Sequence, residues 1–151
     1  VVRSMRDVAV TEVRSLGLAY GRRIFASSNH SPADGPGNAV DGDPSTVWTS
    51  GSVEPSWLVV DLGTVRRVSR ARIAWGREFA REFSLQVSTD GQTWSEARTA
   101  ANDRASPTEI RFAPVDARFV RLTGPKSPPD QSGERRGGPP TYSIREFQVF
   151  E

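Results

Sequence analysis

The segment SWLVVDLGTVRRVSRARIAW, residues 56–75, decides the fold class of this chain. Its opening part, WLVVDL at residues 57–62, is apolar on both faces, which is typical of a strand inside a β-sandwich. Its closing part, RARIAW at residues 70–75, alternates outward and inward side chains with a period of two, as in a half-buried strand. The segment therefore predicts β-structure packed against a core.

The same alternation recurs along the rest of the chain. FSLQVS, residues 83–88, points its apolar side chains inward, and Asp90 and Gly91 after it tolerate the positive φ angles of a hairpin turn. Further short strands are predicted at EIRF, RFVRL and REFQVF, residues 109–112, 118–122 and 145–150. No long segment has a helical period, and 11 prolines and 13 glycines separate the strands. The sequence therefore predicts an all-β sandwich or jelly roll.

Composition excludes several classes of protein. A chain of 151 residues with 36% hydrophobic residues and a mean hydropathy of −0.50 fits one soluble domain with a single core. No apolar run has the length of a bilayer span, so membrane insertion is not expected. The chain opens with no signal-peptide pattern, so a secreted form would have lost its signal or would carry it upstream. Cysteine is absent, which removes disulfides and thiolate metal sites.

Positive charge is carried almost entirely by arginine. The net charge is +2, and Lys126 is the only lysine. Arginine is a good fork for carboxylates, phosphates and sugar hydroxyls, but codon usage in a GC-rich genome gives the same bias. A nucleic-acid-binding protein would more often show a dense basic stripe, whereas the arginines of residues 66–72 alternate with apolar residues, as on the solvent face of a strand. Nucleic acid is therefore not an expected partner.

Two segments stand apart from the strand patterns. Residues 1–17 lack turn signals and are interpreted as a linker or an N-terminal extension, so the domain itself is expected at residues 18–151. Residues 124–143 are rich in proline, glycine and charge and lie between two predicted strands. Loops of that length inside a compact domain are usually functional or disordered.

The predicted elements follow one another as in a known family. The motifs are LAYGRRIFASSNHSP (18–32), NAVDGDPSTVWTS (38–50), the segment 56–75, FSLQVSTDGQTW (83–94), and ARFVRLTG with YSIREFQVF (117–124 and 142–150). In this order and spacing the chain resembles discoidin, or coagulation factor 5/8 type C, domains. Among these it looks most like the family 32 type carbohydrate-binding modules of bacterial glycosidases, which have a galactose-binding-like fold. The resemblance implies a jelly-roll sandwich of about eight main antiparallel strands.

The resemblance also implies a structural calcium site in the turn NAVDGDPSTVWTS. Calcium takes six to eight oxygen ligands, and a turn offers both side-chain and carbonyl oxygens. By resemblance, the side chains of Asp41, Thr46 and Glu146 would be ligands. The carbonyls would come from Asn38, Asp43, Thr46 and Arg145. The alternative is an ordinary Asp-Gly turn with no ion; an EF-hand is excluded by the positions of the glycine and the closing glutamate.

A sugar site would lie on loops at one end of the sandwich, as in the family. The candidate ligand-binding residues are Asn29, His30, Arg77, Glu78 and Tyr142. The alternatives are that His30 is an ordinary loop histidine and that Arg77 pairs with Glu78 on the surface, where such pairs contribute little. Thr49 stands where many galactose-binding members have a histidine, so the sequence does not predict specificity for galactose.

The tryptophans are assigned to the core rather than to this ligand surface. Trp75 continues the inward face of the strand at residues 70–75, and Trp48 anchors the turn before it. Trp57 and Trp94 are interpreted as core residues too.

The predicted function is that of a non-catalytic carbohydrate-binding module, monomeric within a larger secreted or cell-surface enzyme of a GC-rich bacterium. Its partner would be a polysaccharide or glycan. No catalytic residues are predicted, since the carboxylates are partly committed to the metal turn and no Ser-His-Asp set, phosphate-binding loop or histidine cluster is found. The alternative is an adhesion module that binds a protein or an anionic surface such as a polyanion, nucleic acid or lipid head group. Such animal domains use apolar loop tips and usually carry a disulfide, and neither is found here.

Overall fold

The computed structural model describes residues 16–51, 56–77, 82–101, 107–124 and 142–151, and these form an antiparallel β-fold. Its elements are β1 (Arg23–Ala26), the 3-10 helices η1 (Pro32–Asp34) and η2 (Pro36–Ala39), β2 (Trp48–Thr49), β3 (Ser56–Trp75), β4 (Glu82–Ser88), β5 (Ser95–Ala101), β6 (Thr108–Gly124) and β7 (Ser143–Phe150). The predicted all-β class is confirmed. Most of the predicted extension 1–17 and of the loop 124–143 lies outside the described residues.

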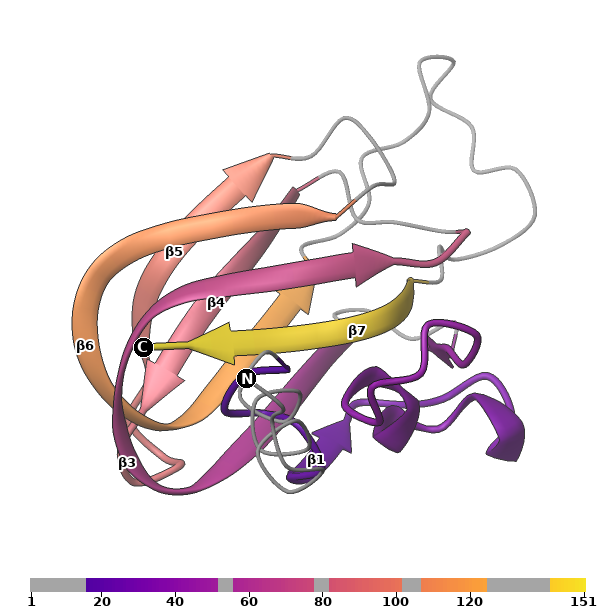
Figure 1. Ribbon diagram of the computed structural model, residues 1–151, viewed down its shortest axis with the longest axis horizontal. Helices are drawn as coiled ribbons and strands as arrows, with labels where there is room; N and C mark the ends of the chain where they lie inside the picture. Colours follow the sequence, from indigo (N-terminus) through magenta and orange to yellow (C-terminus); the bar gives the residue numbers. More distant parts are fainter. Residues whose placement is uncertain (1–15, 52–55, 78–81, 102–106, 125–141) are drawn as a thin grey trace, which may run out of the picture.

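The strands form one sheet that folds over into the two layers of a sandwich. The strand order is β2-β7-β3-β6-β4-β5, and β1 also pairs with β3. β3 and β6 are 20 and 17 residues long, and their pairing shifts register between Asp61 and Arg66. Figure 1 shows both strands curving around the same edge of the molecule at this point. Each long strand therefore serves both layers with its two halves.

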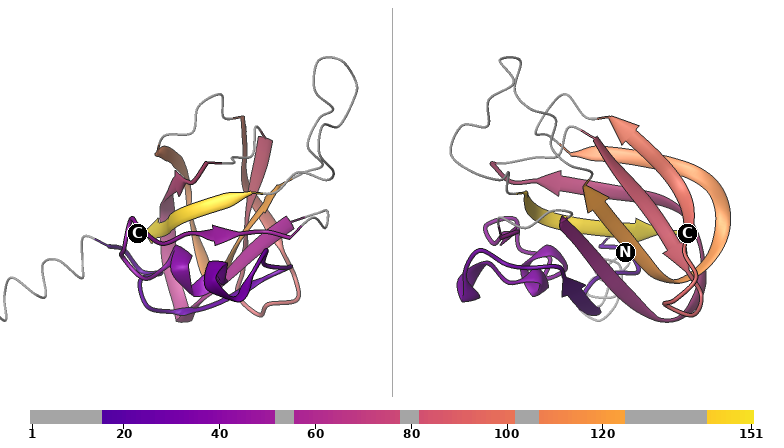
Figure 2. Two further views of the ribbon diagram at one scale, coloured as in Figure 1. Left: turned by 90° about the vertical axis from the view of Figure 1, so that its right-hand side faces the viewer. Right: turned by 180° about the vertical axis from the view of Figure 1, so that it is seen from behind.

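One layer contains β2, β7, the second half of β3 and the first half of β6. The other contains β1, the first half of β3, the second half of β6, β4 and β5. Figure 2, right, shows the second layer from its outer side. The separate strands predicted at 57–62 and 70–75 are thus two halves of β3, because the sequence between them bends without ending the strand.

The core lies between the layers and is built from alternate residues of each strand. The predicted inward residues are confirmed: Ile73 and Leu85 have no exposed surface, and Val87 is 3% exposed. The rings of Trp75 and Phe83 lie 5.5 Å apart at 59° and join the two layers. Burial of such side chains contributes about 1.5–3 kcal/mol each, so the inward side chains of the two layers are a main source of stability.

Two tryptophans depart from the expectation of a buried core. Trp48 and Trp75 are 2% and 4% exposed, as predicted, whereas Trp57 and Trp94 are only half-buried. In the first half of β3, Leu58 turns inward and Trp57 therefore turns outward. The prediction that both faces of residues 57–62 are buried is wrong for this reason, because the outer face of the layer is open to solvent.

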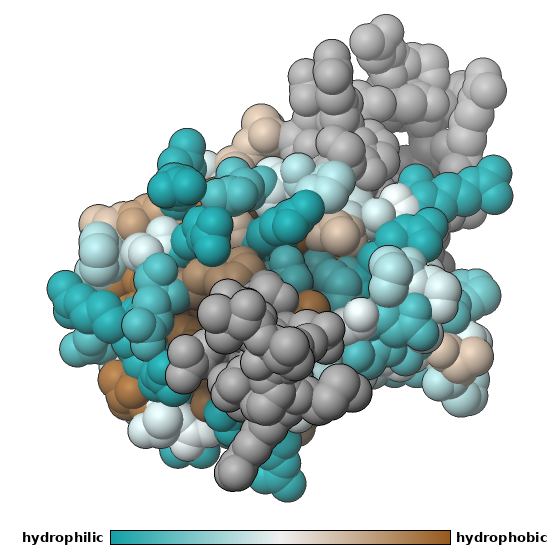
Figure 3. Space-filling model, in the orientation of Figure 1, coloured by the Kyte–Doolittle hydropathy of each residue, from teal (hydrophilic) through white to brown (hydrophobic). Residues whose placement is uncertain are grey.

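Several outward arginines of the first layer are paired with acids. Arg66 contacts Glu151 at 2.8 Å, and Arg67 contacts Asp116 at 3.2 Å. The face seen in Figure 3 carries mainly hydrophilic side chains among scattered hydrophobic ones. This agrees with the prediction that the arginines of residues 66–72 form a solvent face and not a basic stripe. No helix in the described ranges has the length and apolar character of a membrane span.

Candidate functional site

The turn between η2 and β2 is fixed by the side chain of Asn38. Its amide nitrogen Nδ2 donates to the carbonyls of Ala33, at 2.8 Å, and of Val47, at 2.9 Å. Gly42 has a φ of 74°, which a residue with a side chain rarely adopts. The backbone of the turn is therefore held closed by the protein's own hydrogen bonds, without the help of an ion.

Oxygen atoms crowd around the hydroxyl of Thr46. Its Oγ1 lies 2.6 Å from Asp41 Oδ2, 3.1 Å from the Asp43 carbonyl and 3.4 Å from the Asn38 carbonyl. A hydroxyl has one proton to donate, so it satisfies only one of these acceptors at a time. The other acceptor oxygens around Thr46 then receive no proton from this hydroxyl, and the cluster carries an excess of negative partial charge.

Glu146 on β7 brings a second carboxyl group to this cluster. Burial first, and then the hydrogen bond and the charge of Asp41, raise its pKa to about 8, although hydrogen bonds from the backbone N–H groups of Gly42 and Asp43 lower the pKa in part. Its Oε1 is buried and has no hydrogen-bond partner among the described residues. A buried carboxyl oxygen without a partner is costly, and the group requires either a proton or a cation.

This donor set fits a hard cation. It holds carboxylate, hydroxyl and carbonyl oxygens, which are the ligands of calcium. Within the described ranges no three His, Cys, Asp or Glu side chains gather in a metal-binding group, so a site here draws on backbone oxygens as well. The structure brings together Asn38, Asp41, Asp43, Thr46 and Glu146. The backbone carbonyls of Thr46 and Arg145 were also predicted as ligands, but no contact among the residues that the structure describes connects these two carbonyl oxygens to the cluster.

Arg145 instead acts through its side chain. Its Nη1 donates to the Pro44 carbonyl at 2.9 Å. β7 therefore holds the turn from both sides, by Arg145 on Pro44 and by Glu146 on Asp41.

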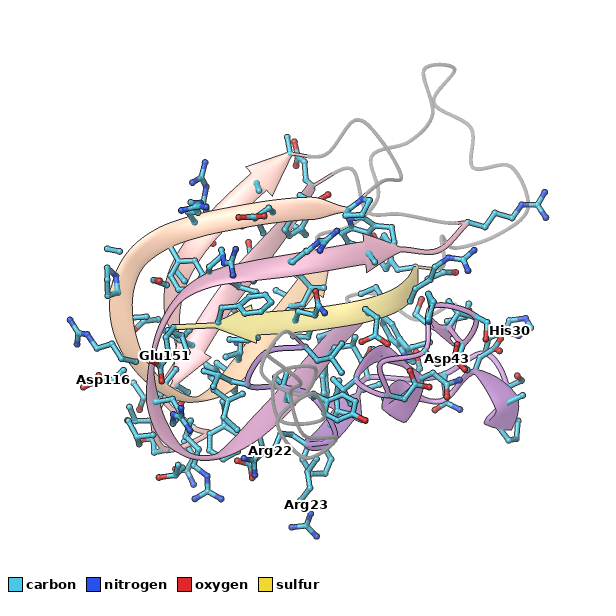
Figure 4. The ribbon with its side chains drawn as sticks, viewed as in Figure 1. Arg22, Arg23, His30, Asp43, Asp116 and Glu151 are labelled. Carbon is cyan, nitrogen blue, oxygen red and sulfur yellow. The ribbon has the colours of Figure 1, made fainter. Side chains whose placement is uncertain are left out.

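Two of the predicted sugar ligands, Asn29 and His30, are exposed on the loop that follows β1. Asn29 Nδ2 donates to the Ser31 carbonyl at 3.1 Å, and the His30 backbone N–H donates to the Thr49 carbonyl at 2.8 Å. Figure 4 places His30 and Asp43 at one end of the molecule, and Asp116 at the opposite end. His30 is thus at the same end of the molecule as the turn that contains Asp43.

Arg77 is exposed directly after β3, and its loop meets the same group of loops. The N–H of Gly76 donates to the Ser143 carbonyl at 2.8 Å, and Ser143 pairs with Thr49. A Cβ on Gly76 would lie 2.6 Å from Ser143 Cβ, so only glycine allows this approach. Backbone contacts therefore connect the His30 loop through Thr49 and Ser143 to the base of Arg77.

The other two candidates are placed differently. Tyr142 is 4% exposed, and a Cβ on Gly124 would touch its ring at 2.9 Å. With Trp48 and Trp75 it lines a small pocket in the interior, so its ring is a core residue and not an open platform for a sugar. Glu78 lies outside the described residues.

Sequence reasoning missed Ser50, the residue that holds the backbone of Tyr142. Ser50 is fully buried, its N–H donates to the Tyr142 carbonyl at 2.8 Å, and its Oγ accepts from the Tyr142 N–H at 2.8 Å. This exchange joins residues 92 positions apart, and a serine after a two-residue strand gives no sequence signal for it.

The chain is similar to known proteins over most of its length. The family model described as "F5/8 type C domain" matches residues 23–140. The polysaccharide lyase 8 family protein HylA of Enterococcus faecalis is 30% identical over 86 residues, which are 55% of this chain and 6% of that protein. This chain thus spans only a small part of that relative.

Two solved structures define the likeness of the fold. Chitosan-binding module 2 of a chitosanase/glucanase from Paenibacillus sp. IK-5, in complex with chitotriose, is 27% identical, with a TM-score of 0.77 over 89% of this chain and 100% of the module. The family 32 carbohydrate-binding module of NanJ from C. perfringens, in complex with galactose, is 23% identical, with a TM-score of 0.70 over 85% of this chain and 93% of that one.

These neighbours are binding modules by name, which agrees with the prediction of a module without catalytic residues. The family match covers β1 to β6 and ends just before β7. This chain belongs to the F5/8 type C domain family.

Proposed function

We propose that this chain is a carbohydrate-binding module that holds a larger glycan-active enzyme on its glycan. The observation that carries the proposal is the cluster of exposed polar side chains at one end of the sandwich. Asn29 and His30 come from one loop and Arg77 from another, and backbone contacts through Thr49 and Ser143 connect the bases of the two loops. A pre-ordered base lowers the entropy cost of binding, which suits a shallow site that makes few contacts.

The chemistry of these side chains suits a sugar. Arginine offers a planar fork of donors to adjacent hydroxyls, and the amide of Asn29 and the imidazole of His30 can each donate or accept. The chitotriose-binding module aligns along its whole length with this chain, which supports an oligosaccharide as the ligand class. Thr49 in place of a histidine does not favour galactose.

A structural calcium ion belongs to the proposal. Asp41, Thr46 and Glu146 would hold it by their side chains, with the carbonyls of Asn38 and Asp43. Its contribution would be charge neutralisation: it would replace the proton that the buried Glu146 otherwise requires. The unpaired Glu146 Oε1 supports this role. The ion would connect the turn to β7 at the end of the sandwich where the His30 loop lies.

The proposed setting is a secreted or cell-surface bacterial enzyme in which this chain is one monomeric module. The similarity to a small part of a polysaccharide lyase and to a module of a chitosanase/glucanase supports an enzyme as the parent. A tethered module raises the local concentration of the attached enzyme without chemistry of its own.

The proposal is tested by a glycan array followed by titration calorimetry with chitotriose and the best array ligand. We expect dissociation constants in the range of roughly micromolar to millimolar. Arg77→Ala should weaken binding about tenfold or more and leave the melting temperature nearly unchanged, because the side chain is exposed.

Arg66→Ala is the matched control, since Arg66 pairs with Glu151 at the end away from His30. It should bind as the unmodified protein does. Equal losses in both variants, or no neutral glycan bound on the array, would overturn the proposal.

A further inference from the structure

A second ligand-sized surface lies on the outer face of the layer that contains β1 and β4. The strands of this layer lie side by side in Figure 2, right. Their pairing sets Phe25 opposite Val59, Val59 opposite Arg121, and Arg121 opposite Gln86, in one row across four strands. All of these side chains alternate with core residues and so point outward.

The row borders a groove of about 300 Å³, within the usual range for ligand sites. Its walls include Phe25, Trp57, Val59, Trp94, Phe119 and Arg121. Phe25 is 52% exposed, and both tryptophans are half-buried. Exposed aromatic surface of this kind is uncommon on a monomer and marks interaction sites.

Arg121 gives the groove its polarity. Its guanidinium carbon lies 4.0 Å from the ring centroid of Trp94, and its Nε donates to Gln86 Oε1 at 2.6 Å. These contacts hold the guanidinium in one orientation at the wall of the groove. Burial lowers the pKa of Arg121, so its surroundings disfavour an uncompensated charge.

Arg121 differs in this from comparable arginines of the fold. Arg70 stacks on Phe150 at 4.2 Å but pairs with Glu109, and Arg118 stacks on Phe119 but pairs with Asp61. Among the residues that the structure describes, no carboxylate pairs with Arg121. A half-buried, oriented guanidinium without an acid is complementary to an anionic group on a ligand.

The shape of the surface restricts the ligand. On β4, beside Arg121, the partly exposed side chains are the polar residues Ser84 and Gln86, so the apolar surface stops there. A stable protein interface needs about 800 Å² from each partner, which a narrow strip between polar strands does not offer. A flat ring with one apolar face and a charged substituent fits the strip.

We propose that this groove binds an acidic glycan, with the C–H face of a uronic acid ring against Phe25 and Trp57 and its carboxylate on Arg121. Trp94 is then a positioning residue, because it stacks on the guanidinium rather than on the sugar. The inference shares the ligand class of the proposed function but uses none of its residues, so either can fail alone.

The test uses trigalacturonate, trimannuronate and a hyaluronan tetrasaccharide, each compared with its carboxyl methyl ester. Binding is measured by calorimetry and by tryptophan fluorescence, which reports on the groove because Trp48 and Trp75 are buried. We expect at least one acid to bind, and its methyl ester to bind about tenfold more weakly. Arg121→Gln should cause the same loss for the acid and little change for the ester.

Arg70→Gln is the matched control, because Arg70 also stacks on an aromatic ring but is already paired with an acid. This variant should bind the acidic sugars as the unmodified protein does. Trp57→Phe should remove most of the fluorescence response. If Arg121→Gln lowers the melting temperature, Arg121→Lys keeps the charge and loses the fork, and should bind with intermediate affinity.

Several results would overturn the inference. One is that none of the three acids binds. Another is that acid and ester bind alike in the unmodified protein. A third is that acid binding is lost in Arg77→Ala and kept in Arg121→Gln, which would place the acidic sugar at the loop end and leave the proposed function standing.

Discussion

Glu146 shows how a single residue connects the turn to the sheet. It lies on β7 opposite Ala74 of β3, and its carboxyl group reaches Asp41 across the interface between turn and strand. Burial raises its pKa to about 8, so without a cation the folded protein holds a proton there at neutral pH. The unfolded chain does not hold that proton, and this difference costs stability.

Replacement of Glu146 by glutamine should therefore have opposite effects with and without calcium. In chelator the variant should melt at the same temperature as the unmodified protein or higher, because glutamine needs no proton. With calcium at a hundred times its dissociation constant the unmodified protein should gain about 2.7 kcal/mol, a rise of about 5–10 °C for a chain of this size. The variant should gain much less. Thermal melts in both buffers give the comparison.

Glu109→Gln is the control, since Glu109 pairs with surface arginines and lies on β6. Its melting temperature should respond to calcium as the unmodified protein does. A calcium response equal in Glu146→Gln and the unmodified protein, or absent from both, would exclude the calcium site.

At the scale of the element, the bend of β3 decides how one sheet becomes two layers. Asp61 lies at this bend, where pairing with β6 shifts register. Its Oδ1 accepts from the Gly63 N–H at 2.8 Å and from Arg118 Nε at 3.0 Å, and its Oδ2 accepts from Arg118 Nη2 at 3.2 Å. Gly63 has a φ of 88° and follows the bend with a backbone that other residues avoid.

Asp61→Asn should destabilise the fold by about 1–2 kcal/mol at neutral pH, because the bidentate pair is half exposed on the arginine side and so is partly screened. The hydrogen bond from Arg118 lowers the pKa of Asp61 below 3.8. A depressed folded pKa gives stability that is present above the unfolded pKa and is lost as the pH falls through the folded value. The difference between the two proteins should therefore shrink below about pH 4.

Urea denaturation at neutral and acidic pH measures this difference. Asp116→Asn on the neighbouring bend segment serves for comparison, since its pair with Arg67 is exposed on both sides and should contribute almost nothing. Similar losses in the two variants would show that the bend does not depend on the Asp61 pair.

Strand periodicity predicted the inward faces but not the length of the strands. Alternation identified Ile73 and Leu85 as core because the period of two is local. It did not reveal that residues 57–62 and 70–75 form one strand, since a bend with a register shift has no local pattern. Hydrophobicity alone wrongly predicted that Trp57 and Trp94 are core residues. Which face of a layer is buried depends on what packs against that layer, and the sequence near these residues does not show this.

The candidate site was predictable where ligands are close in sequence. Asp41 and Thr46 belong to one turn, and their contact at 2.6 Å follows from its tight geometry. Tyr142 was placed wrongly because its ring is buried beside Trp48 and Trp75, which are distant in sequence. Resemblance to a family supplied the whole candidate ligand set, and it alone could supply Glu146, which no local pattern links to the turn.

At the scale of the whole molecule, the predicted glycan site and the C-terminal residue lie far apart. His30 and the metal turn are at one end, and Glu151 is at the other (Figure 4). An enzyme joined by a flexible linker after Glu151 would leave the loop end free. Linked binding raises the effective concentration at a surface, so the benefit should depend on the substrate being a polymer that holds the module.

A fusion of this chain to a catalytic domain that lacks its own module tests this directly. For a chitosanase domain the substrates are chitosan particles and a short soluble chitooligosaccharide, and the rate of product release is measured at low enzyme concentration. We expect the fusion to degrade particles severalfold faster, at most about 100-fold, because avidity operates only at the surface. On the soluble substrate the fusion and the bare domain should have equal rates.

The module alone should release no product from either substrate, because it binds without a catalytic pair of carboxylates. A fusion with Arg77→Ala should lose the gain on particles and keep the rate on the soluble substrate, since Arg77 is an exposed loop residue just after β3 and belongs to the proposed glycan site. The fusion with Arg66→Ala should keep the gain. A gain that persists in Arg77→Ala would mean that the module does not hold the glycan at the loops around His30 and Arg77. Product from the isolated module would contradict its assignment as a binding module.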